Sequence, residues 1–321
     1  MPPDTPDSRG ESSTQPTTVH DAHCHFFSRR FFEAIGREKY GRDAGISAAQ
    51  VAAELGWDEP GEPAALAERW IDELGRHHVS RAALIASVPG DEESVAAAVA
   101  GYPDRFVGYF MLNPTAPDSR ERAERALTVL GFRCICLFPA LHRYRLDELD
   151  VTNAFKIAAT YKAAMFVHCG YFSVEARAKL GLPSVCDLRL GDPLALAATA
   201  VHFPGVPVIV PHFGAGFFRE ALMAAEMCPT IHLDTSSSNG WVKYVPGLTV
   251  TEVFRRVLSV VGPDRVLFGT DSSYFPRGWR RVIYGAQRTA LDELGIEPDA
   301  RARIFAGNFD RLFGPVGQPV G

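Results

Sequence analysis

The sequence lacks the features that mark membrane and nucleic-acid-binding proteins. No apolar stretch reaches 18 residues, so we expect no membrane-spanning helix. No run of five basic residues occurs, and 33 Lys and Arg against 38 Asp and Glu give a formal net charge of −5. This balance argues against nucleic acid or an anionic membrane as the main partner. The first residues carry charges but no apolar segment after them, so we expect no signal peptide.

Cysteine is also scarce, with 6 residues in a chain of 321. This number does not make a disulfide framework in a protein of this length. Most of the cysteines sit inside apolar runs, where a reduced thiol packs as a small hydrophobic group. We therefore expect a cytoplasmic protein. The cysteines are Cys24, Cys134, Cys136, Cys169, Cys186 and Cys228.

The hydrophobic content is 46%, which is enough for a large core. Residues 1–17 are rich in Pro, Ser, Thr and Asp and are expected to form a disordered arm, followed by one domain over residues 18–315. Eight β-rich runs are found in that domain. They are Val19 to His25, Arg81 to Val88, Arg105 to Leu112, Phe132 to Phe138, Ala163 to His168, Val206 to His212, Thr230 to Thr235 and Arg265 to Thr270.

Segments with helical spacing separate these runs, among them Pro63 to Arg76, Asp118 to Leu130, Pro193 to Val201 and Val250 to Val261. Alternation of strand and helix eight times predicts a (β/α)8 TIM barrel, although a doubly wound open sheet uses the same units. The strands are apolar on both faces, as parallel strands between two layers require. We favour the barrel because polar residues recur where the strands end.

The first run ends in Asp21-Ala-His23-Cys-His25. Alternation along a strand predicts that Asp21, His23 and His25 share one face, with His25 nearest the mouth of the barrel. Two imidazoles on one rigid strand can bind a single metal ion, although such pairs also occur by chance. The weight of this pair therefore depends on the other strands.

Three further strands end in a ligand-capable residue: His168 ends the fifth run, His212 the sixth and Asp271 the eighth. Each histidine alone is better explained as a core residue hydrogen-bonded to backbone, but four strand ends agree. Because a barrel brings these ends together, we expect imidazoles and a carboxylate around one divalent transition metal. Zn²⁺ is the preferred assignment, and Mn²⁺, Fe²⁺ or Co²⁺ remain open.

The chain resembles the amidohydrolase superfamily, and within it the amidohydrolase-2 group that includes aminocarboxymuconate-semialdehyde decarboxylase. The resemblance implies one metal held by His23, His25, His168 and Asp271, with His212 as a catalytic acid or base beside it. It extends from Val19 to Phe313 and rests on Asp21-Ala-His23-Cys-His25, His168, Phe203-Pro-Gly-Val-Pro-Val-Ile-Val-Pro-His212-Phe-Gly214, Gly262-Pro-Asp-Arg-Val-Leu-Phe-Gly-Thr-Asp271 and Gly307-Asn-Phe-Asp-Arg-Leu-Phe313.

The fourth run departs from many members of the superfamily, which carry a carboxylated lysine there that bridges two metals. This chain has no lysine between Gly131 and Pro139, so we expect a mononuclear site. Cys134 and Cys136 share one face of that strand. Thiolate ligation is one interpretation of the pair, but their apolar neighbours favour simple packing.

Candidate substrate contacts are weaker. Arg277 and Tyr171 lie in loops that follow strands, and Asp234 ends the seventh run, where it can hold His212, contact substrate or cap the strand. We expect a small-molecule substrate and leave a homodimer open as the assembly.

Two reactions fit the expected residues. The leading interpretation is hydrolysis, in which metal-activated water attacks a small ester, lactone or amide while Asp271 or His212 accepts its proton. The alternative is non-oxidative decarboxylation of an aromatic or unsaturated acid at the same site. A non-catalytic, metal-stabilised barrel is the third hypothesis, and it requires a closed coordination shell.

Overall fold

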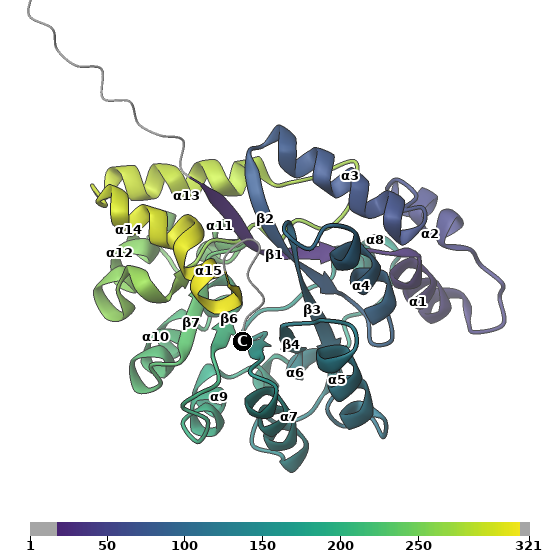
Figure 1. Cartoon of the computed structure of the whole chain (residues 1–321), viewed down its shortest axis with the longest axis horizontal. Coiled ribbons are helices and arrows are strands. Elements are labelled where there is room, and N and C mark those ends of the chain that lie inside the picture. The colour runs from purple at the N-terminus through teal and green to yellow at the C-terminus, as the bar shows by residue number, and fades with distance from the viewer. Residues whose placement is uncertain (1–17, 315–321) are drawn as a thin grey trace, which may run out of the picture.

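Eight parallel strands form one sheet in chain order, and helices surround it in a (β/α)8 TIM barrel (Figure 1). The computed structural model describes residues 18–314, apart from the side chains of residues 238 and 239. The expected arm at residues 1–17, and residue 315, lie outside the described residues. The strands are β1 (Val19–Phe26), β2 (Val79–Ala86), β3 (Phe106–Leu112), β4 (Cys134–Leu137), β5 (Ala164–Val167), β6 (Val208–Val210), β7 (Ile231–Asp234) and β8 (Val266–Leu267).

Helices follow the strands and also fill the longer loops. The helices are α1 (Arg29–Tyr40), α2 (Ala48–Leu55), α3 (Pro63–Arg76), α4 (Glu92–Gly101), α5 (Ser119–Thr128), α6 (Pro139–His142), α7 (Leu149–Thr160), α8 (Glu175–Lys179), α9 (Pro193–Ala200), α10 (Phe218–Met227), α11 (Ser238–Trp241), α12 (Val250–Val261), α13 (Arg281–Glu293), α14 (Pro298–Ala302) and α15 (Asn308–Phe313), with short turns η1 (Leu188–Leu190), η2 (Pro211–Gly214), η3 (Val242–Tyr244), η4 (Pro263–Arg265) and η5 (Arg303–Gly307).

The predicted helices Pro63–Arg76 and Val250–Val261 coincide with α3 and α12. The predicted strands are correct in number and order, but most end earlier than expected. β8 ends at Leu267, three residues before the predicted end. Regular strand pairing stops there because Phe268 N donates to the carbonyl of Ile304, but the carbonyl of Phe268 still accepts from Ala22 N of β1.

The strands carry apolar side chains on both faces, as predicted. One buried cluster fills the barrel and includes Cys134 and Cys136, which therefore pack as small hydrophobic groups. Burial raises the pKa of Cys134 well above its ordinary value, which opposes the thiolate form. From α15, Phe309 and Phe313 belong to the same cluster. A larger cluster lies between the strands and the helices.

The regular alternation predicted for β1 is wrong at one point. A register shift lies between Asp21 and Cys24 in the pairing with β2. Ala22 packs inside the barrel whereas Cys24 packs outside it. Asp21 consequently does not share the face of His23 and His25. Its carboxylate accepts hydrogen bonds from Thr270 Oγ1 at 2.5 Å and Trp279 Nε1 at 2.7 Å, which tie β1 to the chain after β8.

A third apolar cluster joins α1, α2 and α8, which stand together at one side of the barrel (Figure 1). Phe31 and Phe32 come from α1, Val51 from α2 and Ala176 from α8. Trp57 follows α2 and belongs to this cluster, which we call the cap. In the part of the chain that the structure describes, no helix has the length and apolar character that crossing a membrane requires.

Gly170 allows two of the site loops to approach each other, which can be tested by substitution. A Cβ atom there would lie 2.0 Å from the carbonyl oxygen of Gly214, and φ is 78°. We expect Gly170→Ala to lower the free energy of unfolding by about 3 kcal/mol or more in urea titrations. Gly131→Ala is the matched control, because φ is 74° but a Cβ meets no atom within 4 Å. Equal losses in both variants would contradict this explanation.

His232 on β7 is 7% exposed, and burial lowers its pKa to about 4, assisted by Arg311 and Arg265. The unfolded chain binds this proton near pH 6.5, so the stabilising contribution is complete above that pH and is lost as the pH falls toward 4. We expect the stability difference between wild type and His232→Gln to shrink by about 3 kcal/mol from pH 7 to pH 4. Unfolding titrations at both pH values measure it, and a pH-independent difference would contradict it.

Candidate functional site

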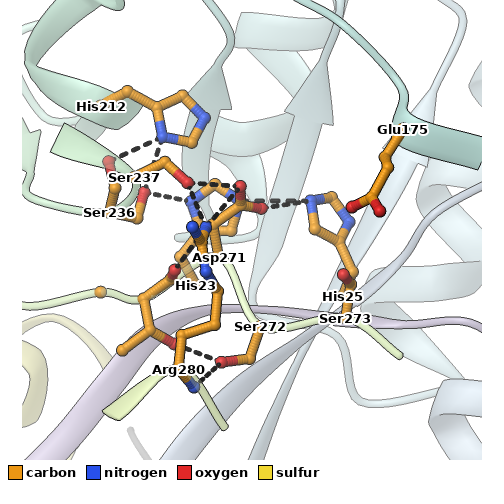
Figure 2. A network of polar contacts seen from close by, with 12 residues as sticks. His23, His25, Glu175, His212, Ser236, Ser237, Asp271, Ser272, Ser273 and Arg280 are labelled. Atoms are coloured by element: carbon orange, nitrogen blue, oxygen red, sulfur yellow. Dashed lines mark hydrogen bonds and ion pairs between the residues drawn. The ribbon is translucent and has the colours of Figure 1, made fainter. Parts of the chain in front are cut away.

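His23 and His25 come from β1 and lie beside Asp271 (Figure 2). The Nδ1 atom of each histidine has a hydrogen-bond partner. His23 Nδ1 donates to Asp234 Oδ2 at 2.7 Å. His25 Nδ1 lies 2.8 Å from Ser87 Oγ, whose own proton goes to the carbonyl of Ile85. Ser87 must therefore accept from His25. Burial lowers the pKa of His23, but Asp234 and the other nearby carboxylates raise it overall, whereas burial lowers the pKa of His25. In the neutral form of each imidazole the Nε2 atom is consequently unprotonated.

The two Nε2 atoms face each other at 3.3 Å. Asp271 Oδ1 lies 3.3 Å from the Nε2 of His25 and 3.6 Å from that of His23. These three residues form the metal-binding group found among the described residues, with all ligand atoms within 4.8 Å of one another. Acceptor atoms at such distances repel one another unless a cation or a proton lies between them.

Asp271 reaches this position through a left-handed backbone, with φ at 61°. Its backbone N donates to the carbonyl of His23 at 2.9 Å, which closes the gap between β8 and β1. Burial would raise the pKa of Asp271, but the neighbouring imidazoles in their protonated form, His25 first through a hydrogen bond, hold it well below its usual range. Asp271 is therefore a carboxylate at neutral pH.

His212 lies in η2 rather than at the end of β6, and its φ of 58° turns the imidazole toward the other histidines. Its Nδ1 lies 2.9 Å from the carbonyl oxygen of Ser236, which can only accept. Nδ1 therefore carries the proton and Nε2 holds a lone pair. Burial lowers the pKa of His212, so the imidazole is neutral at pH 7. The geometry suits a proton acceptor.

His168 follows β5 and lies beside the three-residue group without joining it. Its ring centroid is 5.0 Å from that of His212. Its Nδ1 is buried and has no hydrogen-bond partner. Burial and the neighbouring imidazoles hold its pKa well below its ordinary value. Such an unpaired nitrogen is costly unless a ligand satisfies it.

Asp234 does not occupy either functional position considered from the sequence. It supports His23 rather than His212, and its exposed fraction is 0%. It is also absent from the lining of the cavity, so it does not contact substrate there. Its second oxygen accepts from Ser236 N at 2.6 Å. The end of β7 is buried behind His23, which explains why Asp234 contacts His23 and not His212 or the cavity.

A cavity of about 350 Å³ opens over the site. His25, His168, His212 and Asp271 form its floor. Arg277 and Tyr171 line it as well, and Tyr171 is 44% exposed. Aromatic side chains form part of its wall, among aliphatic and polar ones: Phe27, Phe31, Trp57, Phe138, Phe172, Trp241, Tyr244 and Tyr274.

Some residues of the site were missed from the sequence. Ser87 follows β2 and obeys the same strand-end rule that identified His168, so it could have been found. Glu175 begins α8 and pairs with Arg277 at 3.4 Å. No sequence pattern marks it as a site residue, because it lies in a helix beside the cap and not at a strand end. Arg280 lies 3.7 Å from Asp271, and no sequence pattern marks it as a site residue either.

The residues present fit a divalent metal ion. Two Nε2 lone pairs and a carboxylate oxygen converge, and the buried Nδ1 of His168 has no partner. His23, His25 and Asp271 would hold the ion, with His168 or His212 adding a nitrogen. The hydrogen bond from His23 to Asp234 is of the kind that orients metal-binding histidines.

A (β/α)8 barrel with such a group at the carboxyl ends of its strands defines an enzyme of the metal-dependent barrel class. A family model described as amidohydrolase, of the amidohydrolase-2 type, matches residues 20–314. The chain belongs to the amidohydrolase family. This confirms the family and fold expected from the sequence.

Solved structures share the fold at low identity. The 5-carboxyvanillate decarboxylase of Novosphingobium aromaticivorans, with bound manganese, is 16% identical, with 94% of this chain and 98% of that chain covered and a TM-score of 0.65. A 2,6-dihydroxybenzoate decarboxylase is 17% identical, with 94% and 99% covered and a TM-score of 0.60. A probable 2-pyrone-4,6-dicarboxylic acid hydrolase of Acinetobacter baumannii is 13% identical, with 92% and 99% covered and a TM-score of 0.60.

The role of Asp234 can be measured through metal affinity. Asp234→Asn weakens the acceptor for His23 Nδ1, so we expect Mn²⁺ and Zn²⁺ to bind about tenfold to 100-fold more weakly in chelator competition. Asp310→Asn is the control, because this carboxylate pairs with His20 and Arg81 at the opposite end of the barrel. Equal effects of both substitutions would show that Asp234 acts only through general stability.

Proposed function

We propose that the chain is a metal-dependent, non-oxidative decarboxylase of a planar aromatic or unsaturated carboxylic acid. The observation that carries this proposal is the cavity, whose aromatic wall residues stand over a floor of histidines and one carboxylate, with a guanidinium at the side. The comparisons favour this alternative over the leading interpretation from the sequence, since two of the structures described above are named as decarboxylases of ring carboxylic acids.

The aromatic wall residues support a flat substrate. Phe27 stacks on Phe31 at 3.7 Å between ring centroids, with the planes 1° apart. Phe138 and Phe172 line another part of the cavity, 5.5 Å apart. The remaining faces and edges of these rings are apolar surfaces against which a planar π-system can pack.

Arg277 supplies a positive charge beside the floor. Its guanidinium lies 4.2 Å from the ring centroid of Tyr274 and donates to the carbonyl of Asp271 at 3.4 Å. Glu175 pairs with it at 3.4 Å but is 47% exposed, so the pair is weak and leaves the guanidinium able to bind a carboxylate. A neutral ester would need no such group.

In this reaction the bond between the ring carbon and the carboxyl carbon breaks. Carbon dioxide leaves, and the ring carbon keeps the electron pair and takes up one proton. A bound divalent metal would orient the substrate oxygens and stabilise the negative charge. His212 Nε2 faces the other histidines and is positioned to take up one proton from solvent and pass it to the ring carbon.

Hydrolysis is the second candidate function, and one observation favours it. The unprotonated Nε2 of His212 suits removal of a proton from water. A non-catalytic barrel fits less well, because the metal-binding residues line an open cavity.

To test this proposal, the purified protein is loaded with Mn²⁺ or Zn²⁺ and incubated with a panel of hydroxybenzoates and unsaturated dicarboxylic acids. A parallel panel contains lactones and activated esters. We expect metal-dependent release of carbon dioxide from at least one acid. Lactone or ester cleavage with no carbon dioxide from any acid would establish the hydrolase instead.

Two variants separate the roles within this reaction. His212→Asn should retain bound metal but lose activity by about 100-fold or more, because the proton carrier is gone. Arg277→Gln should raise KM more than it lowers kcat, since it removes a charge that binds substrate. A loss of metal in His212→Asn would identify this residue as a ligand instead.

A further inference from the structure

The two oxygens of Asp271 have different surroundings (Figure 2). Oδ1 faces the Nε2 atoms of His23 and His25. Oδ2 accepts a hydrogen bond from Ser237 Oγ at 2.7 Å and lies 3.7 Å from Arg280 Nη1. One oxygen is therefore directed at the metal-binding group and the other is already bound by the protein.

Arg280 contacts Ser237, and Ser237 in turn contacts Asp271. The Ser237 hydroxyl gives its proton to Asp271, and its oxygen accepts from Arg280 Nη1 at 2.6 Å. A serine that accepts from a guanidinium is a stronger donor to the carboxylate, because the two hydrogen bonds polarise each other. Asp271 Oδ2 is thus held by a polarised hydroxyl and a nearby positive charge.

The backbone around Arg280 keeps it in place. Its N donates to Ser272 Oγ at 2.9 Å. The preceding Trp279 donates from its N to Glu73 and from Nε1 to Asp21. Arg280 is 28% exposed and does not line the cavity, so it has no contact with substrate there.

We propose that Arg280, acting through Ser237, is a positioning residue that holds Asp271 Oδ2 away from the metal. Asp271 then binds the ion through Oδ1 alone. A carboxylate can otherwise bind with both oxygens and take up one more coordination position. Arg280 thereby leaves a position for the substrate.

This proposal uses the metal site of the proposed function but not the choice between decarboxylation and hydrolysis. Failure of the wild-type protein to bind metal would overturn both. Metal binding without carbon dioxide release would overturn the decarboxylase alone and leave this proposal standing.

The experiment compares Arg280→Gln with wild type, using Mn²⁺ and Zn²⁺ affinity from chelator competition and the visible spectrum of the Co²⁺-loaded protein. We expect the affinity to change by about tenfold or more. We also expect weaker Co²⁺ absorption, since a second carboxylate oxygen raises the coordination number. A merely structural role would not change this spectrum.

Three further variants sharpen the result. Arg280→Lys keeps the positive charge, so its Co²⁺ absorption should be close to that of the wild type. Arg281→Gln removes the neighbouring exposed arginine and should behave as wild type. Ser237→Ala removes the bridging hydroxyl and should shift the spectrum in the same direction, which keeps the test decisive if Arg280→Gln fails to fold. Wild-type affinity and an unchanged spectrum in Arg280→Gln, or in Ser237→Ala if Arg280→Gln does not fold, would overturn the proposal.

Discussion

The close approach of His23 Nε2 and His25 Nε2, at 3.3 Å, is the constraint on which the rest of the site depends. Two nitrogens at this distance repel each other unless a proton or a cation lies between them. The arrangement persists because the opposite side of each ring is anchored, one by Asp234 and the other by Ser87. These anchors come from β7 and from the loop after β2, so the barrel itself imposes the arrangement.

The same constraint explains the backbone around the site. His212 and Asp271 both have positive φ, which costs about 1 to 2 kcal/mol for a residue other than glycine. In each case the turned backbone brings a polar side chain toward the histidines of β1. Regular strand geometry would instead carry both side chains along the barrel wall. The backbone is therefore strained at the two positions where the strain brings a possible metal ligand or catalytic group toward His23 and His25.

Much of the fold could be predicted from the sequence because it depends on local patterns. Apolar runs and helical spacing are enough to find eight strands and the limits of α3 and α12. The register shift after Asp21 could not be found this way, because alternation assumes a regular strand. The same assumption placed Asp21 on the strand face of His23 and His25.

The site was predictable only in part, for a related reason. The strand-end rule identifies His23, His25, His168, His212 and Asp271, since their positions follow from barrel topology. It does not identify which donor binds which acceptor. Asp234 supports His23 rather than His212, and Arg280 reaches Asp271 from a segment with no motif. Such pairings depend on tertiary distances of a few ångströms, which no local pattern contains.

The barrel and the cap contribute different parts of the candidate site. The metal-binding residues come from strand ends, but part of the cavity wall comes from Trp57 of the cap and from Glu175, the first residue of α8. Trp57 stacks on Tyr274 at 3.7 Å, and Tyr274 in turn lies under Arg277. The cap therefore sets the position of the cation that would bind substrate. Under the proposed function, a change in α1, α2 or α8 is expected to alter substrate choice without touching the metal-binding group. The family motifs lie outside these helices, so they carry no information on that part of the cavity.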